Sequence, residues 1–254
     1  LDQFIMQAYY LIGLMSGTSL DGLDLCYVEF PSESPKDFKI HAAETFDYKE
    51  DIRQMLFSLR DQDALTFAKT DHQLGILFGN HINEFIRRNN IEKVDAIASH
   101  GHTIFHEPRL GFSSQIGHPA QIHAKTGIKT IADFRTIDTA LGGQGAPLVP
   151  IGDALLFEDY NYCLNLGGVA NVSYDAEGER VACDLVICNM ALNHLAGKKG
   201  LEYDKNGDLA SGGNLNQELF DQLNSFRFFE QTGPKSLGVE QFAEWYLPYL
   251  KYSS

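Results

Sequence analysis

The sequence predicts an α/β protein of two lobes, each built on a sheet. The order strand, glycine-rich turn, strand, strand and helix occurs twice, first from residue 10 and again from residue 162. A segment rich in glycine and proline, LGGQGAPLVP, separates the two occurrences. We therefore expect lobes at residues 1–141 and 142–254, since turn residues in such density mark a linker.

The first half opens with three expected strands. Residues 10–16 form an apolar run that ends in the turn SGTSLDG, and residues 23–30 alternate apolar and polar side chains. Alternation with period two is typical of a strand with one buried face. Residues 38–46 supply the third strand.

Helices and further strands complete the first half. Apolar residues recur at helical spacing between residues 49 and 60 and again in a longer helix that ends at Asn89-Asn90. Beyond it we expect a strand at 94–99, a helix at 119–126 and a strand at 128–134. Pro119 at the first turn and Gly127 just past the end favour the bounds of that last helix.

The second half repeats the opening pattern. We expect strands at 162–166, 169–175 and 180–186, followed by helices at 189–197 and 214–225. The repeat lies in the order of elements, without sequence identity between the halves.

Composition excludes several classes of protein. The net charge is −14 and no run of Lys or Arg exceeds two residues, which argues against a nucleic-acid partner. No apolar stretch approaches the roughly 20 residues that span a bilayer. The 4 cysteines form no CxxC pair, so we expect reduced thiols and a cytoplasmic protein.

Two glycine-rich turns are the main functional signal. The turns are SGTSLDG (16–22) and NLGGVAN (165–171), each between two strands. Successive N–H groups in such turns can bind a phosphate, because glycine lets the backbone approach closely. Each turn alone is also explained by a tight hairpin that needs positive φ. Neither matches the GxGxxG or GxxxxGK[ST] pattern, which argues against Rossmann and Walker sites.

Six segments give a more specific resemblance. In order along the chain they are LMSGTSLDGLD, SHGHTIFHEP, QIGHPAQIHAKTGIKTIADFRTIDTALGGQGAPLVP, NLGGVANVS, YDKNGDLASGG and GPKSLGVEQF. They resemble, from Leu11 to Phe242, the anhydro-N-acetylmuramic acid kinases. The resemblance implies an actin-like (ribonuclease H-like) ATPase fold with mixed five-stranded sheets, and a second lobe that is incomplete in this chain. It also implies ATP-dependent phosphorylation of O6 coupled to hydrolytic opening of the 1,6-anhydro bridge, with Mg²⁺.

The resemblance assigns the phosphate-binding residues. The first loop comprises Gly17, Thr18, Ser19, Leu20, Asp21, Gly22, Leu23 and Asp24, and the second comprises Gly167 and Gly168. Asp21 is the expected Mg²⁺ ligand. We expect the two loops to face each other across one cleft, because a phosphate chain must touch both.

The same resemblance assigns the catalytic base to Asp184. This aspartate is expected near the end of a strand, where a carboxylate could take a proton from the attacking water. The alternative is a carboxylate that caps the helix beginning near Asn189. The residues between them, LVIC, replace the Gly-Pro-Gly turn of the family and leave the placement of the base open.

The expected sugar site comprises His100, His102, Asp133, Arg135 and Gln144. For the histidines, with His106, the alternatives are a structural role and a metal cluster. For Asp133 and Arg135, with Asp138, the alternative is a salt-bridged network. Gln144 equally suits a hinge brace, and Lys235 suits a structural role better than a phosphate contact.

Other functions remain as alternatives. A kinase of another sugar and a non-catalytic sugar or nucleotide sensor both fit the fold. The family's glycine-triplet loop, which holds adenosine, does not follow Phe242, so we expect this chain to bind ATP weakly. The expected partners are a small sugar and ATP, with a homodimer left open.

Overall fold

The computed structural model describes residues 8–17, 20–107, 110–143, 145, 148–233, 235–238 and 241–250. It divides into two compact units, Leu1–Leu148 and Val149–Ser254. The predicted lobe boundary after residue 141 and the predicted cleft remain predictions.

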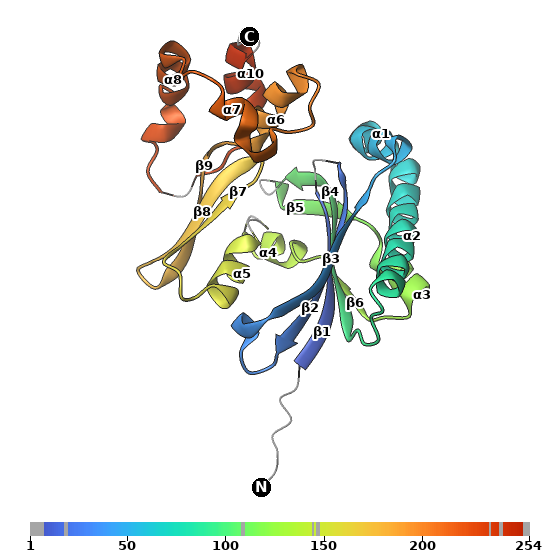
Figure 1. Ribbon diagram of the computed structural model, residues 1–254. Coiled ribbons are helices and arrows are strands. Elements are labelled where there is room, and N and C mark those ends of the chain that lie inside the picture. Colours follow the sequence, from blue (N-terminus) through green and yellow to red (C-terminus); the bar gives the residue numbers. More distant parts are fainter. Residues whose placement is uncertain are drawn as a thin grey trace. The chain divides into compact units, whose positions relative to one another are not determined.

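The first unit is a mixed sheet covered by helices (Figure 1). Its strands are β1 (Ala8–Ser16), β2 (Gly22–Pro31), β3 (Lys39–Asp47), β4 (Ala96–Glu107), β5 (Phe112–Ile116) and β6 (Thr130–Ala132). Its helices are α1 (Glu50–Ser58), α2 (Ala64–Arg88), α3 (Pro119–Thr126) and α4 (Thr136–Ala140). The expected mixed α/β class is confirmed.

The strand order is β3-β2-β1-β4, followed by both β5 and β6 at the far edge of β4. β1 pairs antiparallel with β2 and parallel with β4. β6 pairs parallel with the first part of β4, and β5 pairs antiparallel with its second part. The sheet therefore has five strand positions side by side, and β5 and β6 share the fifth.

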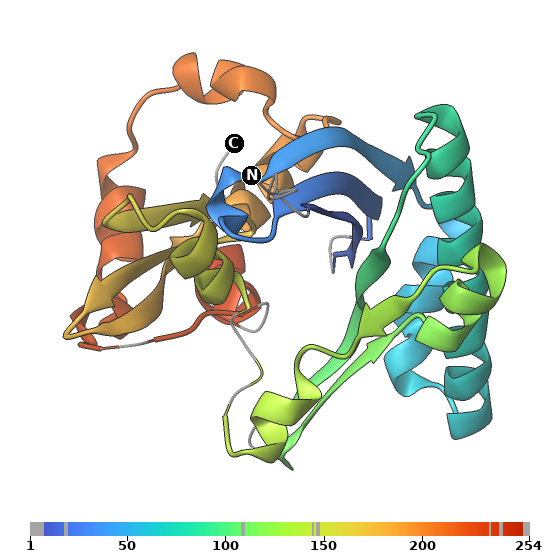
Figure 2. The same ribbon diagram turned by 90° about the horizontal axis from the view of Figure 1, so that it is seen from below.

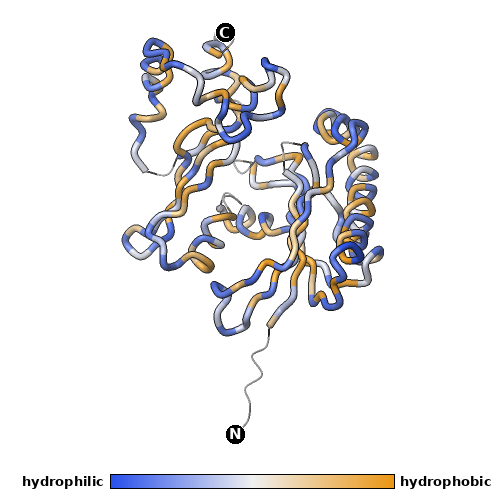
Figure 3. Tube along the Cα trace, in the orientation of Figure 1, coloured by the Kyte–Doolittle hydropathy of each residue, from blue (hydrophilic) through white to orange (hydrophobic). Residues whose placement is uncertain are grey.

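Helix α2 shows why these residues fold locally as they do. Asp63 caps it by accepting a hydrogen bond from the Thr66 N–H, and the apolar stripe Leu74, Phe78, Ile82 and Phe85 is almost fully buried. In Figure 3 apolar and polar residues alternate along this helix, as an amphipathic helix requires. Helices α1, α2 and α3 lie on the same face of the sheet (Figure 1 and Figure 2). Their buried residues form one core with Ile12, Leu14, Leu23, Leu25 and Ile97 of the strands.

The second unit holds a smaller antiparallel sheet in the order β7-β8-β9. Its strands are β7 (Tyr162–Leu166), β8 (Val169–Ala176) and β9 (Glu179–Ile187), and its helices are α5 (Val149–Leu156), α6 (Asn189–Lys198), α7 (Asp208–Ser211), α8 (Gln217–Asn224) and α10 (Leu247–Leu250). A π-helical turn, Phe242–Tyr246, precedes α10. A separate core forms around Ile187, Phe228, Leu237 and Tyr246.

Most predicted elements are confirmed, and two predicted strands differ from those observed. β4 continues through the polar SHGHT segment to Glu107, because β5, which the sequence did not suggest, pairs with it there. β6 covers only Thr130–Ala132 of the predicted strand 128–134. No helix of the described residues is long and apolar enough to cross a membrane.

Candidate functional site

The first glycine-rich turn joins β1 to β2. The Leu20 N–H donates to the Gly17 carbonyl at 3.2 Å, and Leu20 takes a positive φ of 60°. The carbonyl of Asp21 accepts from the Tyr48 N–H at 3.0 Å, and its Oδ1 accepts from the Gly22 N–H at 3.0 Å. The turn is thus fixed against the chain that follows β3. Two of its predicted phosphate contacts, Thr18 and Ser19, lie outside the described residues.

The last three residues of the first predicted loop serve the sheet. A Cβ on Gly22 would lie 2.6 Å from the Phe46 carbonyl oxygen, so glycine is required there by the neighbouring strand. The Leu23 side chain is fully buried in the core. Asp24 Oδ1 accepts a hydrogen bond from Thr45 Oγ1 at 2.5 Å. A phosphate contact from Gly22, Leu23 or Asp24 stays a prediction.

The second glycine-rich turn, Gly167-Gly168, has no internal need for glycine. Neither residue has a positive φ, and an added Cβ would meet its nearest atom at 3.5 Å on Gly167 and 3.7 Å on Gly168. The alternative explanation by positive φ is therefore wrong for this turn. Their carbonyls accept the N–H groups of Cys188, Asn189 and Met190 at the start of α6. Neither glycine N–H donates to another described residue.

Asp184 lies inside β9 and not at its end. Its N–H donates to the Lys235 carbonyl at 2.9 Å, and its Oδ2 accepts from the Leu237 N–H at 2.7 Å. Within the described part of the chain nothing donates to Oδ1. The alternative role as a helix cap is wrong, since Cys188 is the N-cap of α6 and no side-chain hydrogen bond caps that helix. Among the described residues the carboxylate is therefore held through one oxygen, Oδ2.

The segment that holds Asp184 is itself braced by Lys235. The Lys235 ammonium donates to the carbonyls of Phe228 at 3.0 Å and Gln231 at 3.3 Å, and it lies 4.5 Å from the Phe228 ring centroid. This agrees with the structural role favoured by the sequence.

His100, within β4, and Arg135, the residue before α4, form one arrangement. The Arg135 guanidinium donates from Nε (3.2 Å) and Nη2 (3.0 Å) to His100 Nε2, and from Nη1 to the Gly145 carbonyl at 2.7 Å. The other ring nitrogen, Nδ1, lies 3.1 Å from the Gly101 carbonyl. A carbonyl only accepts, so the ring proton sits on Nδ1. Burial, with a smaller opposite effect of the Gly101 carbonyl, lowers the pKa of His100, so the ring is neutral.

His102 belongs to a buried network that the sequence did not suggest. The Tyr48 hydroxyl donates to Ser16 Oγ at 2.7 Å, and Ser16 Oγ lies 3.0 Å from His102 Nδ1. All three residues are less than 5% exposed. Burial raises the pKa of Tyr48 to about 12 and lowers the pKa of His102. The network therefore stays neutral and fixes the His102 ring.

The aspartates near Arg135 serve local structure. Asp133 has a positive φ of 61°, and its Oδ1 accepts from the N–H and the hydroxyl of Thr136. Asp138 Oδ2 accepts from the Gly145 N–H at 2.6 Å. Neither makes an ion pair with Arg135 in the described structure, so the predicted alternative of a salt-bridged network is wrong. Gln144 lies outside the described residues.

The metal alternative for the histidines of β4 gains no support. The group of potential ligands that the described residues bring within 4.8 Å of one another is Asp71, His72 and His118, on α2 and at the start of α3. The His72 and His118 rings are stacked with centroids 4.3 Å apart, so their lone pairs do not converge. Asp71 Oδ1 accepts from the Gly117 N–H and thereby joins the two helices.

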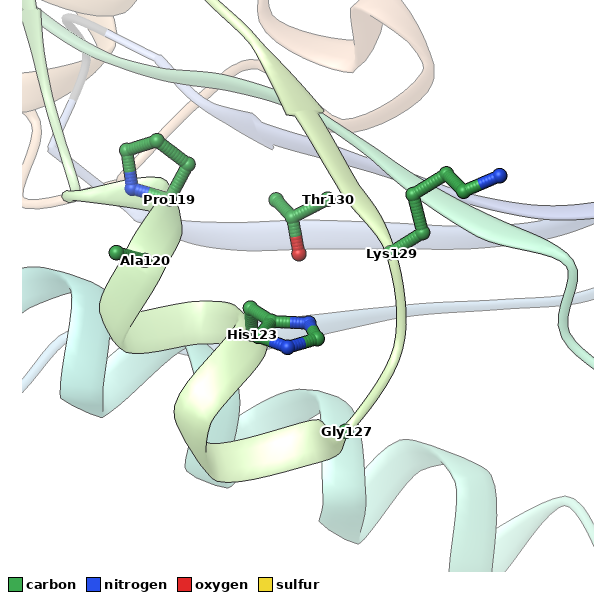
Figure 4. Close-up of a pocket in the computed structure, with 6 residues that line it drawn as sticks. All are labelled: Pro119, Ala120, His123, Gly127, Lys129 and Thr130. Atoms are coloured by element: carbon green, nitrogen blue, oxygen red, sulfur yellow. The ribbon is translucent and has the colours of Figure 1, made fainter.

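A shallow surface hollow of about 640 Å³ lies beside α3 (Figure 4). It is lined by Pro119, Ala120, His123, Gly127, Lys129 and Thr130. None of the predicted site residues lines it, and the His123 ring is already bonded to the Ile128 carbonyl. We assign it no role in the chemistry below.

Comparisons with known proteins return one family and several relatives. The family model described as "Anhydro-N-acetylmuramic acid kinase" matches residues 9–253. The anhydro-N-acetylmuramic acid kinase of Haemophilus influenzae is 38% identical over 249 residues, which cover 93% of this chain and 64% of that protein. The protein of the same name from Pasteurella multocida is 40% identical over 245 residues, which cover 92% of this chain and 64% of that protein. That from Bacillus thuringiensis subsp. konkukian is 36% identical over 255 residues, covering 92% and 66%. The chain thus spans about 64% of the length of the first two relatives.

Proposed function

The chain belongs to the anhydro-N-acetylmuramic acid kinase family, and we propose that it transfers the γ-phosphoryl group of ATP to O6 of 1,6-anhydro-N-acetylmuramic acid while water opens the anhydro bridge. The product would be N-acetylmuramate 6-phosphate. Its place would be the recycling of cell-wall sugars in the cytoplasm, where ATP is present.

The observation that carries this proposal is the Asp184 carboxylate. One of its oxygens is fixed by the Leu237 N–H at 2.7 Å, so the group has a defined direction. The other oxygen is free of hydrogen bonds from the described residues. A general base needs this combination, because it must be aimed and must still accept a proton.

The proposed reaction couples the opening of the anhydro bridge by water to the phosphoryl transfer. Water attacks C1 of the sugar and gives one proton to Asp184, and the C1–O6 bond breaks with its electron pair on O6. O6 then attacks the γ-phosphorus, and the bond to the bridging oxygen of ADP breaks. Such a transfer depends mainly on positioning and on neutralising charge. In this proposal Asp184 takes the proton of the attacking water, whereas the glycine-rich turns bind the phosphates of ATP.

The glycine turn Gly167-Gly168 supports the phosphate-binding part. Two N–H groups that donate to no described residue and two glycines without an internal steric need fit a close approach of phosphate oxygens. Gly17 and Leu20 belong to the corresponding turn of the first unit. Gly167 and Gly168 are the better supported contacts, since the other turn is partly closed by its own hydrogen bond.

Mg²⁺ belongs to this proposal as well. Asp21 carries a carboxylate, the ligand type that Mg²⁺ prefers, at an exposed position in the first turn. When bound, the ion would neutralise charge on the phosphates. A homodimer, which no feature of the described residues favours, stays a prediction.

A release assay tests the proposed function. The full-length protein is incubated with ATP, Mg²⁺ and one sugar, and ADP is measured with a coupled enzyme system. We expect ADP release with 1,6-anhydro-N-acetylmuramic acid and far less with glucose or N-acetylglucosamine. Faster release with another sugar would favour a kinase of that sugar. Binding of the anhydro sugar without ADP release would favour a sensor.

A further inference from the structure

Arg135 is a half-buried cation whose charge has no acidic partner among the residues that the structure describes. Its three hydrogen bonds go to His100 Nε2 and the Gly145 carbonyl, and neither acceptor carries a charge. No acidic side chain of the described residues forms an ion pair with it. Removing a charge from water without an opposite charge costs free energy, and burial lowers the pKa of Arg135.

The surroundings of Arg135 keep this charge uncompensated. His100 is a neutral acceptor, and the neighbouring His106 also has a pKa lowered first by burial and then by Arg135. Asp133 and Asp138, the nearest acids in the sequence, are directed to Thr136 and the Gly145 N–H instead. The protein therefore holds a fixed positive group in a chain whose net charge is −14.

The guanidinium also keeps donors free. It has five N–H groups, of which three donate to described residues, so one on each terminal nitrogen has no acceptor among them. Two such donors on a planar group match the two oxygens of a carboxylate. His100 and Gly145 fix the plane of the guanidinium before any ligand arrives, which lowers the ordering cost of binding.

We propose that Arg135 binds the carboxylate of the substrate's lactyl ether, and that it thereby selects anhydro-muramic acid over anhydro sugars without that group. This assignment rests on the proposed function, because it takes its ligand from the proposed substrate. His100 is then a positioning residue for Arg135 and not itself a sugar contact. The γ-phosphate of ATP is the competing anion, and the experiment separates the two.

The experiment compares two sugars that differ in the lactyl group, 1,6-anhydro-N-acetylmuramic acid and 1,6-anhydro-N-acetylglucosamine. We expect Arg135→Gln to lower kcat/KM for the muramic sugar by roughly 10- to 100-fold, the range for a lost charged hydrogen bond, and to change the glucosamine sugar little. Arg135→Lys should recover part of the loss, since it restores the charge without the fork. Arg60→Gln, which removes an exposed arginine paired with Glu107, is the matched control and should change neither sugar.

An equal loss of kcat/KM for both sugars in Arg135→Gln would overturn the proposal and assign Arg135 a structural role. A raised KM for ATP with both sugars would overturn it in favour of a phosphate contact. Calorimetry of each sugar without ATP gives a readout that needs no turnover. We expect the wild type to prefer the muramic sugar and Arg135→Gln to lose that preference. If neither sugar is phosphorylated, the proposed function fails, but the difference in affinity between the two sugars still tests the role of Arg135. Equal affinities of the wild type for both sugars, or no binding of either, would overturn the assignment.

Discussion

Asp184→Asn separates a catalytic base from a structural carboxylate. The asparagine side-chain oxygen can still accept from the Leu237 N–H, which lies 2.7 Å from Oδ2, and the main-chain bond to Lys235 is unaffected. The only change to the fold is that the Leu237 N–H donates to a neutral amide oxygen in place of a charged carboxylate oxygen. That difference is about 1 kcal/mol in the free energy of unfolding. The variant should therefore fold with nearly unchanged stability.

Turnover should respond far more strongly. An amide cannot accept the proton of the attacking water, so kcat should fall by about 10²- to 10⁴-fold, the usual share of general-base catalysis. The assay is ADP release by the full-length protein at saturating sugar, with urea unfolding in parallel. Asp175→Asn is the matched control, because Asp175 is an exposed aspartate of β8 paired with Arg180. Near wild-type turnover in Asp184→Asn would refute the reasoning, and a loss of several kcal/mol in stability would assign Asp184 to the fold.

Three further predictions follow from packing and charge. Gly168→Ala should leave the free energy of unfolding unchanged, because the added Cβ would lie 3.7 Å from Met190. It should raise the KM for ATP, because glycine at this position lets phosphate oxygens approach the backbone closely. Gly22→Ala, whose Cβ would lie 2.6 Å from the Phe46 carbonyl, should lose about 1–3 kcal/mol in urea unfolding; the opposite ranking would contradict this. Ser99→Ala should raise the free energy of unfolding by up to about 1 kcal/mol, since the buried Ser99 Oγ has no hydrogen-bond partner among the described residues. Ser173→Ala should lower it, because the Asp153 carboxylate loses the hydroxyl that donates to it and Arg180 loses one of its acceptors. Stability should also fall as the pH drops below about 6.5, because the pKa values of His81, His100 and His102 are lowered by burial and the unfolded chain then binds more protons. A flat urea-unfolding profile between about pH 6.5 and 5.5 would contradict that expectation.

Local signals in the sequence predict most of the elements. Pro119 and Gly127 bound α3 as expected, and Gly127 takes the left-handed conformation that favours glycine after a helix. β4 could not be bounded in this way. Its second half is polar, and it remains a strand only because β5 pairs with it from beyond residue 110.

The site was predictable in its residue types but not in its contacts. The resemblance named Asp184, Arg135 and both histidines, yet the partners that define their roles are distant in sequence. Ser16 and His102 are 86 positions apart, and Asp184 and Leu237 are 53 apart. A polar residue at the end of an apolar strand, as at Ser16, was the one available signal for the buried network. No local pattern indicates that Tyr48 would reach it.

The fate of the oxygen atoms tests the central claim most directly. The full-length protein is supplied with 1,6-anhydro-N-acetylmuramic acid and ATP in water labelled with heavy oxygen, and the product is examined at once by mass spectrometry and phosphorus–proton NMR. The account predicts phosphate on O6 and heavy oxygen on C1 of the same molecule. Phosphate on C1, or heavy oxygen in free phosphate beside unchanged sugar, would contradict it.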